Sequence, residues 1–281
     1  MPGRFQDINF ELDKLPTMPV VASQMMELIN NPETSASQLA GVVSKDPAVS
    51  ARVLKIANSS FYSMSRQVTS MSTAVVILGE RTLRNLVLAA SMRGMHSHFG
   101  KVEQMLWEDS MVCALASRFL AGKLALVDPE EAFMAGLFRH IGLVVLNNQE
   151  SRAAEFIINS LKANNQEMGK EEREAFGATH AEIGAAVLEH WKLSEVLSLV
   201  ALHHSDVDFA RVADEVAVKM TCIVNIAGRM PGHLGIFGAP RVLNFEEMRG
   251  LQHLDVPEER LLALIEDFVM LFNQHRSEFL S

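Results

Sequence analysis

Apolar residues recur at helical spacing along most of this chain. In residues 102–120, for example, they lie three or four positions apart, which places them on one face of a helix. Alternating patterns of β-branched residues, which are typical of strands, are hard to find. The pattern therefore predicts an all-α fold. Helices are expected over about 19–30, 35–44, 47–58, 71–78, 80–94, 102–123, 129–147, 150–163, 169–176, 180–191, 194–204, 211–230, 244–252 and 257–280.

Several expected helices begin with residues that cap a helix well. Asp46 and Asp128 each precede a proline, which gives an N-cap acceptor followed by proline at the first helical position. Thr179 and Glu182 have the spacing of a capping box. These signals support the predicted starts near residues 47, 129 and 180.

A polar, glycine-flanked segment, GMHSHFGK at residues 94–101, separates two groups of expected helices. We therefore expect an N-terminal helical bundle in residues 1–98 and a second helical subdomain in residues 99–231. The helices that follow are expected to form a C-terminal extension in residues 232–281.

Three polar side chains interrupt faces that otherwise predict a core. Asp109 fills a gap in the apolar stripe of residues 102–120, so it is either at a solvated helix margin or buried beside a polar partner. Arg139 and His140 are the only polar side chains in residues 132–146. A helix that is apolar all round is packed on several sides, so both side chains are expected near the core.

Composition and charge exclude several classes of protein. The 281 residues are 48% hydrophobic, and the formal net charge is −9 without a basic run, which argues against nucleic-acid binding. The N-terminus lacks the apolar core of a signal peptide, and residues 132–146 are too short for a membrane span. Cys113 and Cys222 lack zinc-site spacing and are expected to be buried. We expect a cytoplasmic protein with no membrane partner.

Several motifs in order resemble the HDOD (HD-related output domain) family of bacterial signalling proteins. They are LPTMP near residue 15, KDPAVSARVLKIANSSFY from residue 45, and SMSTAVVILGE from residue 70, followed by DPEEAFMAGLFRHIGLVVL and THAEIGAAVLEHWKL. The resemblance covers roughly residues 12–230. It implies an N-terminal helical bundle joined to a degenerate subdomain of the kind found in HD phosphohydrolases.

The resemblance also points to four positions of a metal site. Catalytic HD phosphohydrolases bind a divalent metal through a His, a His-Asp pair and an Asp, and the matching positions here are Asp109, Arg139, His140 and Gly228. An arginine offers only hydrogen-bond donors and a glycine has no side chain, so two of the four positions cannot ligate. We therefore expect no catalytic residue and no metal, with the Arg139 guanidinium replacing the cation beside Asp109.

A rearranged metal site is the alternative. His180, His203 and His204 resemble positions where some HD enzymes hold further ligands, and they are candidate residues for binding a residual ligand. Together with Asp109 and His140 they offer an alternative donor set for a divalent metal.

The resulting functional hypothesis is a non-catalytic signalling or regulatory module that binds a signalling protein or a small ligand. Asn58, Ser60 and Phe61 are a candidate partner surface, and the apolar helical surface is compatible with a homodimer. One alternative is a divergent metal-dependent phosphohydrolase that acts on a nucleotide or cyclic dinucleotide. Another is a helical scaffold with no ligand.

Overall fold

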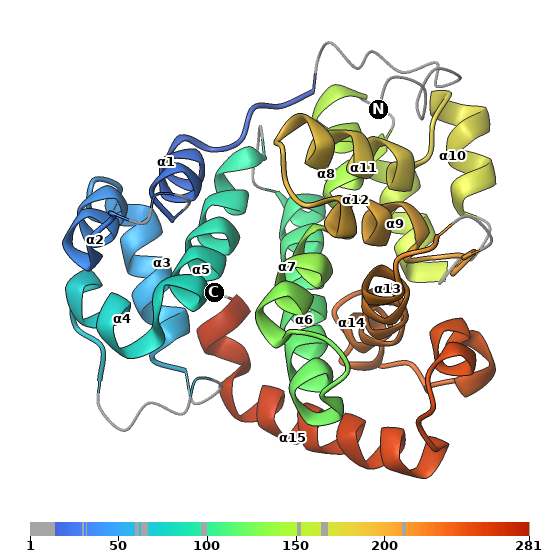
Figure 1. Ribbon diagram of the computed structural model, residues 1–281. Coiled ribbons are helices and arrows are strands. Elements are labelled where there is room, and N and C mark those ends of the chain that lie inside the picture. Colours follow the sequence, from blue (N-terminus) through green and yellow to red (C-terminus); the bar gives the residue numbers. More distant parts are fainter. Residues whose placement is uncertain are drawn as a thin grey trace. The chain divides into compact units, whose positions relative to one another are not determined.

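A computed structural model describes residues 15–29, 31, 33–59, 62, 67–96, 100–150, 153–163, 168–209 and 212–280 (Figure 1). Across these residues the chain is helical and contains no strand, so the predicted all-α class is confirmed. The chain forms two compact units. One contains residues 18–97 and 266–281, and the other contains residues 1–17 and 98–265.

The unit of residues 18–97 is organised around one helix, α5. Its helices are α1 (Val20–Ile29), α2 (Ala36–Ser44), α3 (Pro47–Ala57), α4 (Met71–Leu78), α5 (Glu80–Met92) and the 3₁₀ turn η3 (Arg93–Met95). Helix α5 contacts α1, α3 and α4, and residues 82–92 are buried except Arg84. Asp46 caps α3 as the sequence predicted, accepting hydrogen bonds from the backbone of residues 48 and 49.

The unit of residues 98–265 contains the helices that carry the candidate site. They are α6 (Lys101–Leu124), α7 (Pro129–Phe138), α8 (Ile141–Gln149), α9 (Ala153–Ala163), α10 (Met168–Phe176), α11 (His180–His190), α12 (Glu195–His203), α13 (Glu215–Ala227), α14 (Met230–His233), η4 (Phe245–Glu247) and η5 (Arg249–His253). The last helix, α15 (Glu258–Leu280), contributes its first residues to this unit and the rest to the other. None of the helices described is long and apolar enough to cross a membrane.

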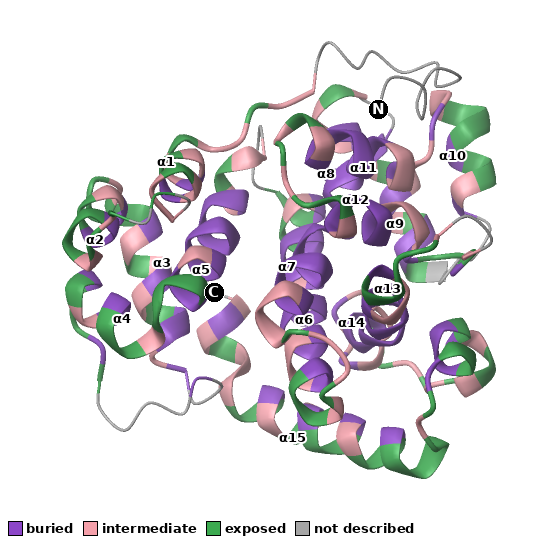
Figure 2. Ribbon diagram, in the orientation of Figure 1, coloured by how far each residue is buried: buried purple, intermediate pink, exposed green. Residues whose placement is uncertain are grey.

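Helices α6 and α7 of this unit pack side by side, and both are largely buried (Figures 1 and 2). Residues 132–138 of α7 are buried, and so is most of α6 between residues 102 and 121. The two backbones approach closely at Gly136, where an added Cβ would lie 2.6 Å from Ser117 Oγ and 2.8 Å from the Cys113 carbonyl oxygen. This packing holds the buried face of α6 against the end of α7.

The sequence predicted a single helix over residues 129–147, and this prediction is wrong because the helix is broken in its middle. Helix α7 ends at Phe138 and α8 begins at Ile141, with His140 at φ −107° and ψ 19° between them. The physical reason is the pair of polar side chains at the break, because Arg139 and His140 both reach the same carboxylate on α6. The periodicity of apolar residues does not reveal such a tertiary contact. A prediction from periodicity therefore treated the two helices as one.

A second close approach fixes α8 against α11. A Cβ on Gly142 would lie 1.9 Å from the carbonyl oxygen of His180 and 2.8 Å from the backbone nitrogen of Gly184. Only a residue without a side chain fits there. The contact therefore brings the start of α8 beside the start of α11, and with them His140 beside His180.

Two other expected elements differ in detail. Residues 244–252 form the 3₁₀ turns η4 and η5 rather than an α-helix, and the helix expected over 211–230 is α13 followed by a turn and α14. Thr179 and Glu182 form the predicted capping box at the start of α11. Cys113 and Cys222 are both buried and unpaired with each other, as expected.

Candidate functional site

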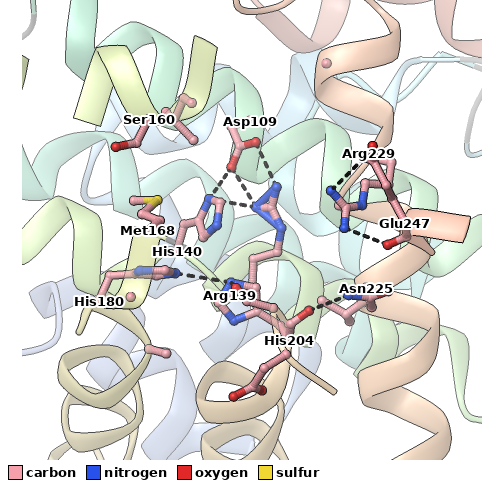
Figure 3. Close-up of a pocket in the computed structure, with 18 of the residues that line it drawn as sticks. Asp109, Arg139, His140, Ser160, Met168, His180, His204, Asn225, Arg229 and Glu247 are labelled. Atoms are coloured by element: carbon pink, nitrogen blue, oxygen red, sulfur yellow. Dashed lines mark hydrogen bonds and ion pairs between the residues drawn. The ribbon is translucent and has the colours of Figure 1, made fainter. Parts of the chain in front are cut away.

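The centre of the site is a buried ion pair between α6 and the end of α7. Arg139 Nη1 donates to Asp109 Oδ2 at 2.6 Å, and Nη2 donates to Oδ1 at 2.8 Å, so the pair is bidentate (Figure 3). Asp109 is fully buried and Arg139 is 2% exposed. The ion pair predicted from the sequence is therefore present, and the reading of Asp109 as a solvated helix margin is wrong.

Gly228 provides the space that Arg139 occupies. A Cβ at Gly228 would lie 3.2 Å from Arg139 Nε and 3.1 Å from the Val224 carbonyl oxygen, which is tighter than an ordinary contact. The four positions that match the ligands of HD phosphohydrolases therefore do not fit a metal. A guanidinium binds both carboxylate oxygens of Asp109. The glycine at the fourth position offers no ligand and leaves space for the guanidinium.

His140 contacts the same carboxylate at Oδ2, the oxygen that also accepts from Arg139 Nη1. Its Nδ1 lies 2.8 Å from Asp109 Oδ2 and 2.9 Å from Arg139 Nη1. Because an ionised carboxylate has only acceptors, Nδ1–H donating to Oδ2 is the tautomer that satisfies Asp109. The Nε2 atom of His140 then carries a lone pair.

His180 is held by a carboxylate that sequence reasoning missed. Both its Nδ1 and its backbone N–H donate to Glu172 of α10, with Nδ1 2.7 Å from Oε2 and the backbone nitrogen 2.9 Å from Oε2. Glu172 is fully buried. A signal was present, because Met168, Glu172 and Phe176 recur every four residues and Glu172 therefore lies on the same face as two apolar side chains.

His204, just after α12, completes a group of three imidazoles. Its Nδ1 donates to the Ala201 carbonyl oxygen at 2.8 Å, and its Nε2 lies 3.3 Å from His180 Nε2 and 3.1 Å from Ser205 Oγ. One ring nitrogen of each of His140, His180 and His204 lies within 4.8 Å of the others. We call these three residues the histidine cluster.

Burial controls the charge of His140 and His204. It lowers the pKa of His140 well below the ordinary value, and the neighbouring Arg139 and His180 act in the same direction. It also lowers the pKa of His204, where His140 and His180 add to the effect. His140 and His204 are therefore neutral at pH 7, and each keeps one nitrogen lone pair.

A cavity of about 650 Å³ opens beside the ion pair and the histidine cluster (Figure 3). Its wall contains five Lys or Arg and four Asp or Glu side chains, although the chain as a whole has a net charge of −9. The basic residues are Arg139, Lys170, Arg173, Arg229 and Arg241. The cavity is therefore more basic than the rest of the protein.

Two of these arginines lie close to other positive charges. Burial lowers the pKa of Arg229, and the neighbouring Arg139, Arg249 and Arg241 lower it further while Glu247 opposes them. Arg241 donates to the carbonyl oxygens of Leu161, at 2.6 Å, and of Lys162. Neither arginine had a sequence signal, because both come from turns beyond α13 whose path depends on the fold.

The remaining predicted residues lie apart from the histidine cluster. His203 lines the cavity, but it is not one of the three clustered histidines, and its Nδ1 lies 4.0 Å from Asp206 Oδ1. Asn58 ends α3, where its amide donates to the Leu54 and Val68 carbonyl oxygens. Ser60 and Phe61, the other two residues of the candidate partner surface, lie outside the described residues.

Comparison with known proteins agrees with this fold. Residues 15–207 match the HDOD domain family. An uncharacterised protein of Treponema pallidum is 25% identical over 198 residues, which are 69% of this chain and 38% of that protein. This chain thus spans well under half the length of that curated relative.

Two solved structures resemble almost the whole chain. An HDOD domain protein of unknown function from Geobacter sulfurreducens is 23% identical with a TM-score of 0.71, covering 96% of this chain and 95% of that one. A proposed phosphohydrolase from Shewanella amazonensis is 25% identical with a TM-score of 0.71, covering 95% and 94%. Both likenesses extend past residue 207, the last residue of the family match.

Proposed function

Since this chain belongs to the HDOD family, we propose that it is a non-catalytic regulatory module whose cavity binds a small anionic ligand. The observation that carries the proposal is the bidentate pair of Arg139 and Asp109 at the positions that match a metal site. In this pair both oxygens of the Asp109 carboxylate are already bound by the guanidinium and cannot ligate a metal cation. The cavity beside the pair remains available for binding.

Loss of the hydrolytic metal follows from the chemistry of the residues. Hydrolysis at such a site usually needs three protein ligands and an open water position. Arg139 places a positive charge where the cation would lie, and Gly228 supplies no ligand. These residues support binding without turnover.

Preference for an anion follows from the cavity wall. A volume of about 650 Å³ lies within the range usual for small-molecule sites. Lys170, Arg229 and Arg241 lie on its wall, and burial lowers the pKa of Arg229 and of Arg241, so a bound anion that pairs with these two guanidinium groups is favourable. Phe237 and Leu202 add apolar surface beside these charges, which suits a phosphorylated ligand with an organic part.

A divergent phosphohydrolase is the second candidate function. The histidine cluster favours it, because three imidazoles with an open fourth position are a known ligand set for catalytic zinc. This function predicts release of phosphate that depends on His140, whereas the regulatory module predicts binding alone.

The test is isothermal titration of the untagged protein with four probes: pyrophosphate, a nucleoside monophosphate, a cyclic dinucleotide and an uncharged nucleoside. At least one phosphate probe is expected to bind, and the nucleoside is not. Arg229→Gln and Arg241→Gln should each weaken binding about 10- to 100-fold, since each removes a charge-assisted hydrogen bond. Arg260→Gln is the matched control, because Arg260 is exposed on α15 and does not line the cavity.

A parallel incubation with each probe and Mn²⁺ measures phosphate release. Binding without release supports the regulatory module. Release that His140→Ala abolishes would establish the phosphohydrolase instead. Failure of every phosphate probe to bind would leave the helical scaffold as the better description.

A further inference from the structure

We propose that Arg229, Arg241 and Glu247 form a subsite for a phosphate monoester, and that Glu247 occupies this subsite as an internal counter-ion until the ligand displaces it. This subsite rests on the proposed function, and it restricts the anion in the cavity to one that carries about two negative charges. All three residues line the cavity. They come from the part of the chain between the end of α13 and the end of η4.

Glu247 is a carboxylate that faces two arginines. Burial lowers the pKa of Arg229 and of Arg241, and the charge of Glu247 opposes this shift for both. One carboxylate therefore serves two guanidinium groups, and one positive charge within the subsite stays uncompensated. Elsewhere on the cavity wall arginine and carboxylate pair one to one, in Arg139 with Asp109 and in Arg173 with Glu182.

Two contacts of the Glu247 carboxylate are long (Figure 3). Its Oε2 lies 3.8 Å from Arg229 Nη1, which is beyond hydrogen-bond distance, and its Oε1 accepts from Asn244 Nδ2 at 3.4 Å. The Glu247 side chain is 38% exposed. Arg229 Nη2 also donates to the Glu247 backbone carbonyl oxygen at 2.8 Å. Displacing the carboxylate leaves this backbone hydrogen bond in place, so the turn can stay anchored while the subsite opens.

Arg241 is positioned by contacts that leave part of its guanidinium for a ligand. Its Nη2 donates to the carbonyl oxygens of Leu161, at 2.6 Å, and of Lys162 at the end of α9. The guanidinium carbon lies 5.7 Å from the centroid of the Phe237 ring. In the part of the chain that the structure describes, no carboxylate forms an ion pair with Arg241. Its Nε and Nη1 atoms are therefore available for charge-assisted hydrogen bonds to an anion.

A tethered carboxylate raises the affinity that a ligand needs. Such a group acts at a local concentration on the order of millimolar, so a free anion must interact with the two arginines better than Glu247 does. A free carboxylate or a phosphodiester brings one negative charge, which is no more than Glu247 already supplies. A phosphate monoester brings about −1.5 to −2 charges at pH 7 and three acceptor oxygens. It therefore matches two guanidinium groups, and we expect it to displace Glu247 where a diester does not.

The experiment is isothermal titration at pH 8 with a nucleoside 5′-monophosphate and with the 3′,5′-cyclic monophosphate of the same nucleoside. These two probes share a base and a sugar, but the monoester carries about two negative charges and the cyclic diester carries one. The wild-type protein is expected to bind the monoester about 10-fold more tightly or better. Pyrophosphate is the third probe, because it has the charge without an organic part.

Glu247→Gln tests the competition. The change keeps the shape of the side chain and removes its charge, so it should strengthen binding of all three probes by about 5- to 30-fold. Glu247→Ser is a second variant with the same expected direction. Glu246→Gln is the matched control, because Glu246 is exposed on the same turn and does not line the cavity, and its affinities should stay within about 2-fold of wild type. Circular dichroism checks that each variant folds.

A crystal structure of the protein with the bound monoester measures the displacement directly. The phosphate is expected within hydrogen-bond distance of Arg229 and Arg241, with the Glu247 carboxylate moved away from Arg229. A phosphate bound elsewhere in the cavity, with Glu247 still beside Arg229, would overturn the subsite.

Three results of the titrations would also overturn it. Weaker binding by the Glu247 variants would show that Glu247 positions the arginines instead of competing with the ligand. Equal strengthening by Glu246→Gln would assign the effect to the overall charge, and equal affinities for the two nucleotides would exclude a preference for the monoester. An anion binds in each of these cases, so the proposed function would stand. Failure of all three probes with every variant would overturn the proposed function, and this subsite with it.

Discussion

Replacing Arg139 with methionine tests the central ion pair most directly. The change removes both hydrogen bonds to Asp109 and leaves a fully buried carboxylate with His140 Nδ1 as its remaining partner among the contacts described above. Breaking a buried pair by removing one member costs about 3–5 kcal/mol of unfolding free energy. Methionine retains most of the apolar stem, so the loss comes mainly from the charge.

A double-mutant cycle is completed by removing the charge of Asp109 as well. Asp109→Asn keeps an oxygen that accepts from His140, and the double variant Asp109→Asn/Arg139→Met contains no unpaired charge. It should therefore be more stable than Arg139→Met alone, by about 1–3 kcal/mol, because the two residues are in direct contact and their effects do not add. A variant in which both changes simply add would show that the pair is not coupled.

The loss of unfolding free energy caused by Arg139→Met should also depend on pH. Burial raises the pKa of Asp109 to about 6, and the Arg139 charge opposes that rise, so without Arg139 the pKa is higher still. A carboxyl group whose pKa is raised by folding stabilises the folded state at low pH and loses that stabilisation as pH rises through the folded-state pKa. The difference between wild type and Arg139→Met should therefore grow from pH 5 to pH 8.

Urea unfolding followed by circular dichroism measures all four proteins of the cycle at both pH values. The reasoning is refuted if Arg139→Met costs less than about 1 kcal/mol at pH 8, where the free carboxylate would be ionised. It is also refuted if the deficit shrinks as pH rises. The m-value must stay constant across the four proteins for the comparison to hold.

Three further predictions concern the packing around the site and the α3 terminus. Gly142→Ala should lower the unfolding free energy measured in urea by about 1–3 kcal/mol or more, because its Cβ would overlap a carbonyl oxygen of α11. Gly122→Ala on the exposed surface of α6 is the control, and it should raise the unfolding free energy by up to about 1 kcal/mol. Asn58→Ala should cost about 1–3 kcal/mol by leaving backbone groups unpaired, and a loss of partner binding with unchanged stability would contradict this structural role. Burial raises the pKa of the Cys113 thiol to about 11 and that of Cys222 to about 12, so neither should react with a disulfide reagent at pH 8 until the protein unfolds, and rapid reaction of the native protein would show that a thiol is exposed.

Local sequence signals were sufficient to predict most of the helices. Caps such as Asp46 and Thr179 form hydrogen bonds within three residues, so their effect is visible in a short window. The break at Arg139 and His140 was not visible, because its cause is a carboxylate about thirty positions earlier in the chain. An apolar stretch predicts burial better than it predicts where a helix ends.

The candidate site was predictable only in part for the same reason. Family resemblance placed Asp109 and Arg139 at matching positions, and charge complementarity then predicted their contact. Glu172 and Arg241 reach the site from α10 and from a late turn, and their roles depend on packing between distant segments. The apolar residues Met168 and Phe176, four positions before and after Glu172, were a signal for its burial, whereas the charge of Arg241 alone is typical of a solvated surface.

The fit of Arg139 against Gly228 restricts how this site can change by single substitutions. A Cβ at position 228 would lie 3.2 Å from Arg139 Nε, so the guanidinium would have to shift by a few tenths of an ångström. A smaller residue at position 139 would leave both an unpaired buried carboxylate and an unfilled space beside Gly228. The two positions are therefore epistatic, because a change at one alters the space that the side chain at the other position meets.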